Sequence, residues 1–278
     1  QSKAPIFASI SLFTLMLGGA SWLNGFGPGK WLFFAGVTMM ISTLFYWFSE
    51  VVRESLAGHY NRQVDVSFRM GMIWFIFSEV MFFAAFFGAL FYLRVLVGPW
   101  LDGEGGRGAS AMLWPNFHFS WPLLANPDPQ QFPAPRGVID PWHLPLLNTV
   151  LLVSSSFTLT FAHHALRHDK RGPLKAWLAL TVLFGASFLV LQAEEYVHAY
   201  TELDLTLRSG VYGATFFMLT GFHGAPVPIG ALMLLVMLIR ILRGHFSPAQ
   251  HFGFEAAGWY WHFVDAVWLG LFVFVYVL

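Results

Sequence analysis

The sequence predicts an all-α integral membrane fold with seven transmembrane helices, and two observations lead to that prediction. Of the 278 residues, 56% are hydrophobic and only 11% are charged, whereas a soluble domain carries about 25% charged residues. The apolar residues are also gathered into seven long runs. A helix needs roughly 20 apolar residues to cross a bilayer, and each run approaches that length.

The seven runs account for most of the chain, so residues 1–278 are predicted to form a single membrane domain. The first run, Pro5–Leu23, is long enough to span, and we interpret it as a helix rather than as a cleaved signal. The expected helices cover about Pro5–Leu23, Trp31–Phe48, Met70–Leu93, Leu144–Ala162, Ala176–Ala193, Ser209–Ile239 and Ala256–Leu278.

The longest connection, residues 98–141, is rich in proline, glycine and tryptophan. Its proline density argues against a long helix, and its aromatic content argues against a flexible linker. We expect an ordered external loop that packs on its neighbours.

In the sixth run, Pro226 and Pro228 remove two helical hydrogen-bond donors, which predicts a kink near His223.

The distribution of lysine and arginine predicts the orientation. With the N-terminus in the cytoplasm, ten of the 15 Lys and Arg residues fall on the inner side. Three of the other five, including Arg107, flank or lie in the long loop, and long loops count little in the positive-inside rule. We therefore expect a cytoplasmic N-terminus and an external C-terminus.

Composition also excludes several classes of function. The net charge is zero, which argues against a nucleic-acid partner. The absence of cysteine excludes disulfides, thiolate copper centres and iron–sulfur clusters. A redox metal would need histidine or carboxylate ligands alone.

A few polar groups fall within the predicted helices. Glu79 lies alone in the apolar stretch "WFIFSEVMFF", where an unpartnered charge is expensive in lipid. It is either a structural carboxylate, protonated or hydrogen-bonded, or a proton-exchanging site. With His223, His262 and Asp265 it suggests an internal polar cluster. His262 and Asp265 share a helical face, and we interpret them as a packing pair. No catalytic residue is expected.

Two groups of residues lie at the predicted cytoplasmic ends of the helices. Such residues suit either the phosphate of an anionic lipid or a belt of snorkelling side chains. Trp47, Arg53, Glu54 and His59 follow the second run, and Arg240 and Arg243 follow the sixth.

A third group of residues, His163, His164 and His168, has the spacing of one box of a membrane di-iron enzyme. Such enzymes need several boxes. We therefore place these histidines at the lipid headgroups and expect no metal site.

Several motifs, in order from about Trp47 to the C-terminus, resemble subunit III of the haem–copper cytochrome c oxidases. They are "WFSEVVRES", "GMIWFIFSEVMFF", "PLLNTVLLVSSS", "AHHAL", "LQAEEY", "GVYGATFFMLTGFHG" and "HFGFEAAGWYWHFVDAVW". The last motif is the most specific.

The resemblance implies a two-helix bundle and a five-helix bundle that form a V-shaped, phospholipid-binding cleft. It implies no cofactor in this chain, with haem and copper held by partner subunits, and contact mainly with subunit I in a complex that includes subunit II. Glu79 corresponds to the family's carbodiimide-reactive carboxylate, and the six cytoplasmic residues named above correspond to lipid contacts. The subunit would support proton uptake and the stability of subunit I.

The expected location is a bacterial inner membrane, with an aa3-type oxidase and a periplasmic C-terminus. One departure is Pro226, which stands where the family usually has a second histidine. That histidine is a candidate partner of Glu79, which here would have to use His223 or go without. The alternatives are subunit III of a quinol oxidase, the homologue associated with nitric oxide reductase, a membrane di-iron enzyme and a secondary transporter.

Overall fold

The computed structural model describes residues 2–105 and 108–278. Gly106 and Arg107, which belong to the predicted external loop, lie outside the described residues, as does Gln1. The described residues form helices joined by turns and loops, without strands. Seven helical segments are long and apolar enough to cross a membrane, which confirms the predicted fold class.

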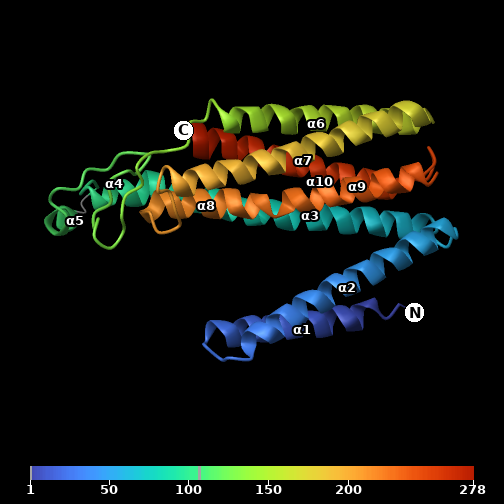
Figure 1. The fold of residues 1–278 in the computed structure, drawn as a ribbon, viewed down its shortest axis with the longest axis horizontal. Coiled ribbons are helices and arrows are strands. Elements are labelled where there is room, and N and C mark those ends of the chain that lie inside the picture. Colours follow the sequence, from blue (N-terminus) through green and yellow to red (C-terminus); the bar gives the residue numbers. More distant parts are fainter. Residues whose placement is uncertain (1, 106–107) are drawn as a thin grey trace. The chain divides into compact units, whose positions relative to one another are not determined.

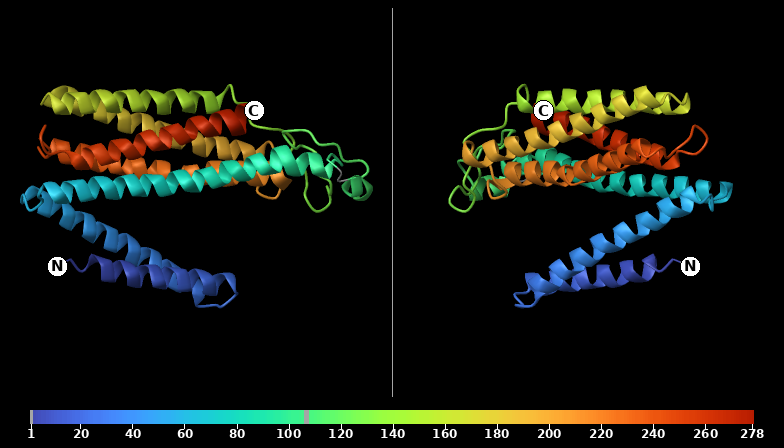
Figure 2. Two further views of the ribbon diagram at one scale, coloured as in Figure 1. Left: turned by 180° about the vertical axis from the view of Figure 1, so that it is seen from behind. Right: turned by 45° about the vertical axis from the view of Figure 1, so that its right-hand side comes forward.

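Internal contacts divide the chain into two compact units, Gln1–Ser67 and Phe68–Leu278, whereas a single membrane domain is predicted from the sequence. The first unit is a helical hairpin of α1 (Ala4–Leu23) and α2 (Gly29–Leu56), drawn in blue in Figures 1 and 2. A Cβ atom at Gly36 would lie 2.4 Å from the backbone nitrogen of Leu15. The two helices therefore pack backbone against backbone at this glycine, as small residues allow in lipid.

The second unit contains most of helix α3 (Arg62–Phe91), which runs on through the π-helical turn η1 (Tyr92–Val97) into α4 (Gly98–Leu101). This helical segment ends at Leu101, beyond the expected end at Leu93. Pro99 lies near the start of α4, and the helical segment continues through it to Leu101.

The remaining long helices of the second unit run roughly parallel or antiparallel to α3 (Figures 1 and 2). They are α6 (Leu144–Arg167), α7 (Arg171–Thr201), α8 (Gly210–Gly224), α9 (Pro226–Leu242) and α10 (Phe252–Leu271), which continues into the π-helical η2 (Phe272–Val277). The sixth span is interrupted at Ala225, between α8 and α9. The interruption lies beside Pro226, in the region where a kink is predicted.

The long connection before α6 includes the short helix α5 (Gly108–Leu113). As expected, it packs on the helices of the second unit, since Phe117, Leu123 and Ile139 are buried in the same hydrophobic core as residues of those helices. The Arg136 guanidinium lies 2.6 Å from the carboxylate of Asp204, in the loop that precedes α8. The two connections therefore hold each other at this end of the bundle.

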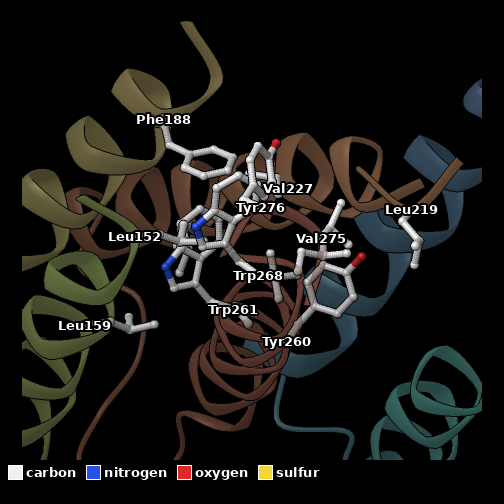
Figure 3. Close-up of a cluster of buried hydrophobic side chains, with 14 of the residues drawn as sticks. Leu152, Leu159, Phe188, Leu219, Val227, Tyr260, Trp261, Trp268, Val275 and Tyr276 are labelled. Atoms are coloured by element: carbon white, nitrogen blue, oxygen red, sulfur yellow. The ribbon is translucent and has the colours of Figure 1, made fainter. Parts of the chain in front are cut away.

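The centre of the second unit is built around Trp261 of α10, which is fully buried (Figure 3). A Cβ atom at Gly185 of α7 would lie 2.7 Å from its indole ring, and one at Gly230 of α9 would lie 2.8 Å away. The indole Nε1 donates a 2.7 Å hydrogen bond to the Ser155 hydroxyl of α6. One side chain thus joins four helices.

Replacing Ser155 with alanine should destabilise the second unit, because the buried Trp261 Nε1 would lose its only hydrogen-bond acceptor among the described residues. An orphaned buried donor costs about 1–3 kcal/mol. We expect a lower temperature of denaturation for the membrane complex that contains this chain. Ser154→Ala, on the same helix but without that bond, is the matched control. Equal denaturation temperatures for both variants would contradict this account.

Candidate functional site

Glu79 lies on α3 and is partly exposed. Its neighbours along the helix face are aromatic: Phe75 stacks on the Tyr260 ring at 5.8 Å, and Phe82 contacts the Phe222 ring at 5.2 Å. Among the described residues, Glu79 has no hydrogen bond and no ion pair. The carboxylate therefore sits on an apolar face of the second unit without a fixed protein partner.

His223 of α8 is buried, 1% exposed, and does not reach Glu79. Its Nε2 donates a 3.1 Å hydrogen bond to the backbone carbonyl of Val264 on α10. Its ring packs against Phe83, Phe188 and Trp268. His223 therefore fixes α8 to α10, close to the break before Pro226.

His262 and Asp265 lie together on α10, facing α6. His262 Nδ1 is 3.2 Å from the Ser156 hydroxyl, and Asp265 lies beside the same serine. Asp265 Oδ1 is buried without a hydrogen-bond partner in the part of the chain that the structure describes. His262 contacts a serine of α6, whereas His223 donates to a backbone carbonyl of α10. The residues expected to form one internal polar cluster therefore make separate polar contacts.

Sequence reasoning missed a second buried carboxylate, Glu195 of α7. It is fully buried, and its Oε1 accepts hydrogen bonds from the Tyr276 hydroxyl at 2.6 Å and from Gln192 Nε2 at 3.2 Å. Asn148 of α6 extends the network to Gln192 at 3.5 Å. The predicted fifth helix ended at Ala193, but α7 continues to Thr201 and carries Glu195 inside. The Gln–Glu spacing of three residues on one helix was the available signal.

A polar contact also forms where α6 ends and α10 begins. His163 Nε2 lies 3.4 Å from His251 Nε2 and 3.8 Å from a carboxylate oxygen of Glu255. Arg69 of α3 binds the other oxygen of the same carboxylate. Sequence reasoning placed His163 among lipid headgroups with His164 and His168, because it could not see that two distant segments meet here.

The expected lipid contacts of the first unit lie at the end of α2 and in the turn after it. Arg53 is largely exposed and pairs with Glu50 at 3.3 Å, and His59 is exposed. The Tyr60 hydroxyl donates a 2.9 Å hydrogen bond to Glu54. Burial and this bond raise the pKa of Tyr60 to about 12, so it remains a neutral donor at physiological pH.

The remaining first-unit residue of that set, Trp47, is 45% exposed and stacks on Phe48 with ring centroids 5.6 Å apart. An exposed, stacked indole near a helix end suits the interfacial region of a membrane.

In the second unit, the expected contacts follow α9. The Arg240 guanidinium lies 4.2 Å over the Phe246 ring, and its Nε is buried without a hydrogen-bond partner in the described ranges. Arg243 is exposed. Burial and these two arginines lower the pKa of His245. Arg171 of α7 donates to the carbonyls of His245 and Phe246, which holds this segment in place.

Comparison with known families gives the decisive observation. The profile described as "Cytochrome c oxidase subunit III" matches residues 1–101 and 110–278. The match covers all seven spans. The chain belongs to the cytochrome c oxidase subunit III family.

Individual members of the family are similar over nearly the full length. Cytochrome c oxidase subunit 3 of Heterololigo bleekeri is 41% identical over 276 residues, 99% of this chain and 94% of that protein. The subunit 3 of Triticum aestivum is 40% identical over 99% of this chain and 93% of its own length. That of Oryctolagus cuniculus is 40% identical, with coverage of 99% and 94%. The resemblance found in the motifs is thereby confirmed.

Proposed function

We propose that this chain is a non-catalytic subunit of a proton-pumping cytochrome c oxidase, where it supports the stability and proton uptake of subunit I. The observation that carries the proposal is the family match over residues 1–101 and 110–278, together with about 40% identity to proteins named as subunit 3. Subunit I would be the main contact, with subunit II in the same complex. Haem and copper would belong to those partners, and bound phospholipids to this chain.

The chemistry of the described residues supports a role without a redox centre of its own. His223 and His262 bind a carbonyl and a serine, and each contact joins two helices. Glu195 and Tyr276 likewise join α7 to η2. The chain has no cysteine for a thiolate copper site.

We further propose that the chain lies in the inner membrane of a bacterium, with its N-terminus in the cytoplasm and its C-terminus in the periplasm. The excess of lysine and arginine in the segments that this orientation places inside supports it. The ends of α2 and α9, with Arg53, Arg240 and Arg243, would then face the cytoplasm.

Purification through an affinity tag on this chain, in a mild detergent, tests the complex. We expect haem absorbance, a large haem-bearing subunit, a copper-bearing subunit and oxygen consumption driven by reduced cytochrome c. Oxidation of quinol but not of cytochrome c would favour a quinol oxidase. A colourless chain recovered alone would contradict the proposal.

Replacing Glu79 with glutamine should leave assembly and most oxygen reduction intact, because the carboxylate has no fixed partner among the described residues and faces aromatic side chains. Haem content measures assembly, and oxygen consumption measures oxygen reduction. Glu79→Asp, which keeps a carboxylate, is the control. Near-complete loss of turnover in the glutamine variant alone, at normal haem content, would show that the carboxylate is catalytic.

We propose that the end of α9 binds an anionic phospholipid. A half-buried Arg240, an exposed Arg243 and a segment held by Arg171 together create a positive surface beside the apolar helix. A basic side chain near a membrane contributes about 1 kcal/mol to the binding of anionic lipid. Trp47, Arg53, Glu54 and His59 are proposed as lipid contacts of the first unit.

Replacing Arg240 and Arg243 together with alanine should weaken retention of anionic phospholipid by roughly 30-fold, the equivalent of about 2 kcal/mol. Mass spectrometry of lipids that co-purify with the complex measures the change. Arg208→Ala, in the loop before α8 at the other end of this span, is the matched control. Unchanged lipid content in the double variant would leave these arginines as snorkelling residues only.

A further inference from the structure

Three side chains of the second unit, His163, His251 and Glu255, bring one ligand atom each to a common point. We refer to them as the His–His–Glu cluster. His163 comes from the last turns of α6, His251 immediately precedes α10, and Glu255 lies in the first turn of α10. Their side chains are 35%, 10% and 16% exposed. The cluster is thus partly shielded from water but open enough for an ion to enter.

The distances within the cluster are those of a metal site. His163 Nε2 and His251 Nε2 are 3.4 Å apart, and Glu255 Oε1 lies 3.1 Å from the latter and 3.8 Å from the former. Zinc binds imidazole nitrogen and carboxylate oxygen at about 2.0–2.1 Å in tetrahedral geometry, which separates neighbouring ligand atoms by about 3.3 Å. The three observed separations bracket that value, so an ion needs little rearrangement.

The surroundings of the cluster orient its ligand atoms. His251 Nδ1 lies 3.1 Å from the backbone carbonyl of Ser247. A carbonyl only accepts, so Nδ1 carries the proton and Nε2 turns its lone pair toward the cluster. Arg69 binds the other carboxylate oxygen of Glu255 and leaves Oε1 for the histidines. Such outer contacts to carbonyls and charged groups are typical of metal-binding histidine and carboxylate ligands.

We propose that His163, His251 and Glu255 form a binding site for a zinc-type divalent cation, with a fourth position open to water. The ion would connect the end of α6 to the start of α10. Because Arg69 offsets the carboxylate charge, the site has a lower affinity than a structural zinc site with several anionic ligands. Its occupancy therefore depends on the zinc concentration.

Zinc counting on the intact membrane complex, purified through a tag on this chain, tests the proposal. The complex is treated with a chelator, equilibrated with zinc and analysed by mass spectrometry of the metal. The unsubstituted complex should retain about one more zinc ion per chain than the His163→Gln and His251→Gln variants, since each removes a ligand. Metals held elsewhere in the complex appear equally in all samples.

His164→Gln is the matched control, because His164 adjoins His163 in sequence but lies outside the cluster. We expect it to retain the extra zinc. Equal zinc content in all four complexes would overturn the proposal. Should the ligand variants fail to assemble, anomalous diffraction at the zinc edge from zinc-soaked crystals of the unsubstituted complex decides. A peak between the two Nε2 atoms supports the site, and zinc found only elsewhere, or nowhere, refutes it.

Discussion

The insertion of Trp261 between two glycines is the contact on which the second unit depends. An indole that lies against Gly185 of α7 and Gly230 of α9, while donating to Ser155 of α6, fixes four helices with one side chain. In lipid there is little hydrophobic driving force between helices, so close packing and interhelical hydrogen bonds must hold them. Trp268 repeats the arrangement nearer the C-terminal end of α10, where its Nε1 donates to Thr149 at 2.9 Å. The serines and threonines of α6 thus serve as acceptors for the aromatic face of α10.

The polar groups inside the second unit follow from the same need for hydrogen bonds between helices in lipid. Most of them join one helix to another: His223 joins α8 to α10, Glu195 joins α7 to η2, and His262 joins α10 to α6. Glu79 differs, since its neighbours are aromatic rings and it has no partner in the described part of the chain. A carboxylate in that position is suited to an interaction outside the chain, with lipid, water or a neighbouring subunit, rather than to holding the bundle together.

The helices could be predicted from sequence because apolar length is a local property that the bilayer imposes. The break before Pro226 was equally predictable, because proline lacks a backbone donor. The ends of the helices could not be predicted in the same way, because a helix can continue through polar residues beyond its apolar run, as α7 does around Glu195. The meeting of His163 with His251 could not be predicted either, because it depends on how α6 packs against α10. Because Pro226 replaces the family's second histidine, the sequence indicated that Glu79 would have to use His223 or remain without a histidine partner. In the structure His223 bonds to Val264, and Glu79 has no histidine partner among the described residues.

The hydroxyl acceptors on α6 also bear on how the chain is made. Of the seven spans, the last contains the largest buried share, and it carries a carboxylate, an imidazole and two indole donors that find acceptors or neighbours on α6. Left alone in lipid, these groups would oppose insertion. Since α6 precedes α10 in the chain, we expect stable integration of the final span to depend on α6 being present.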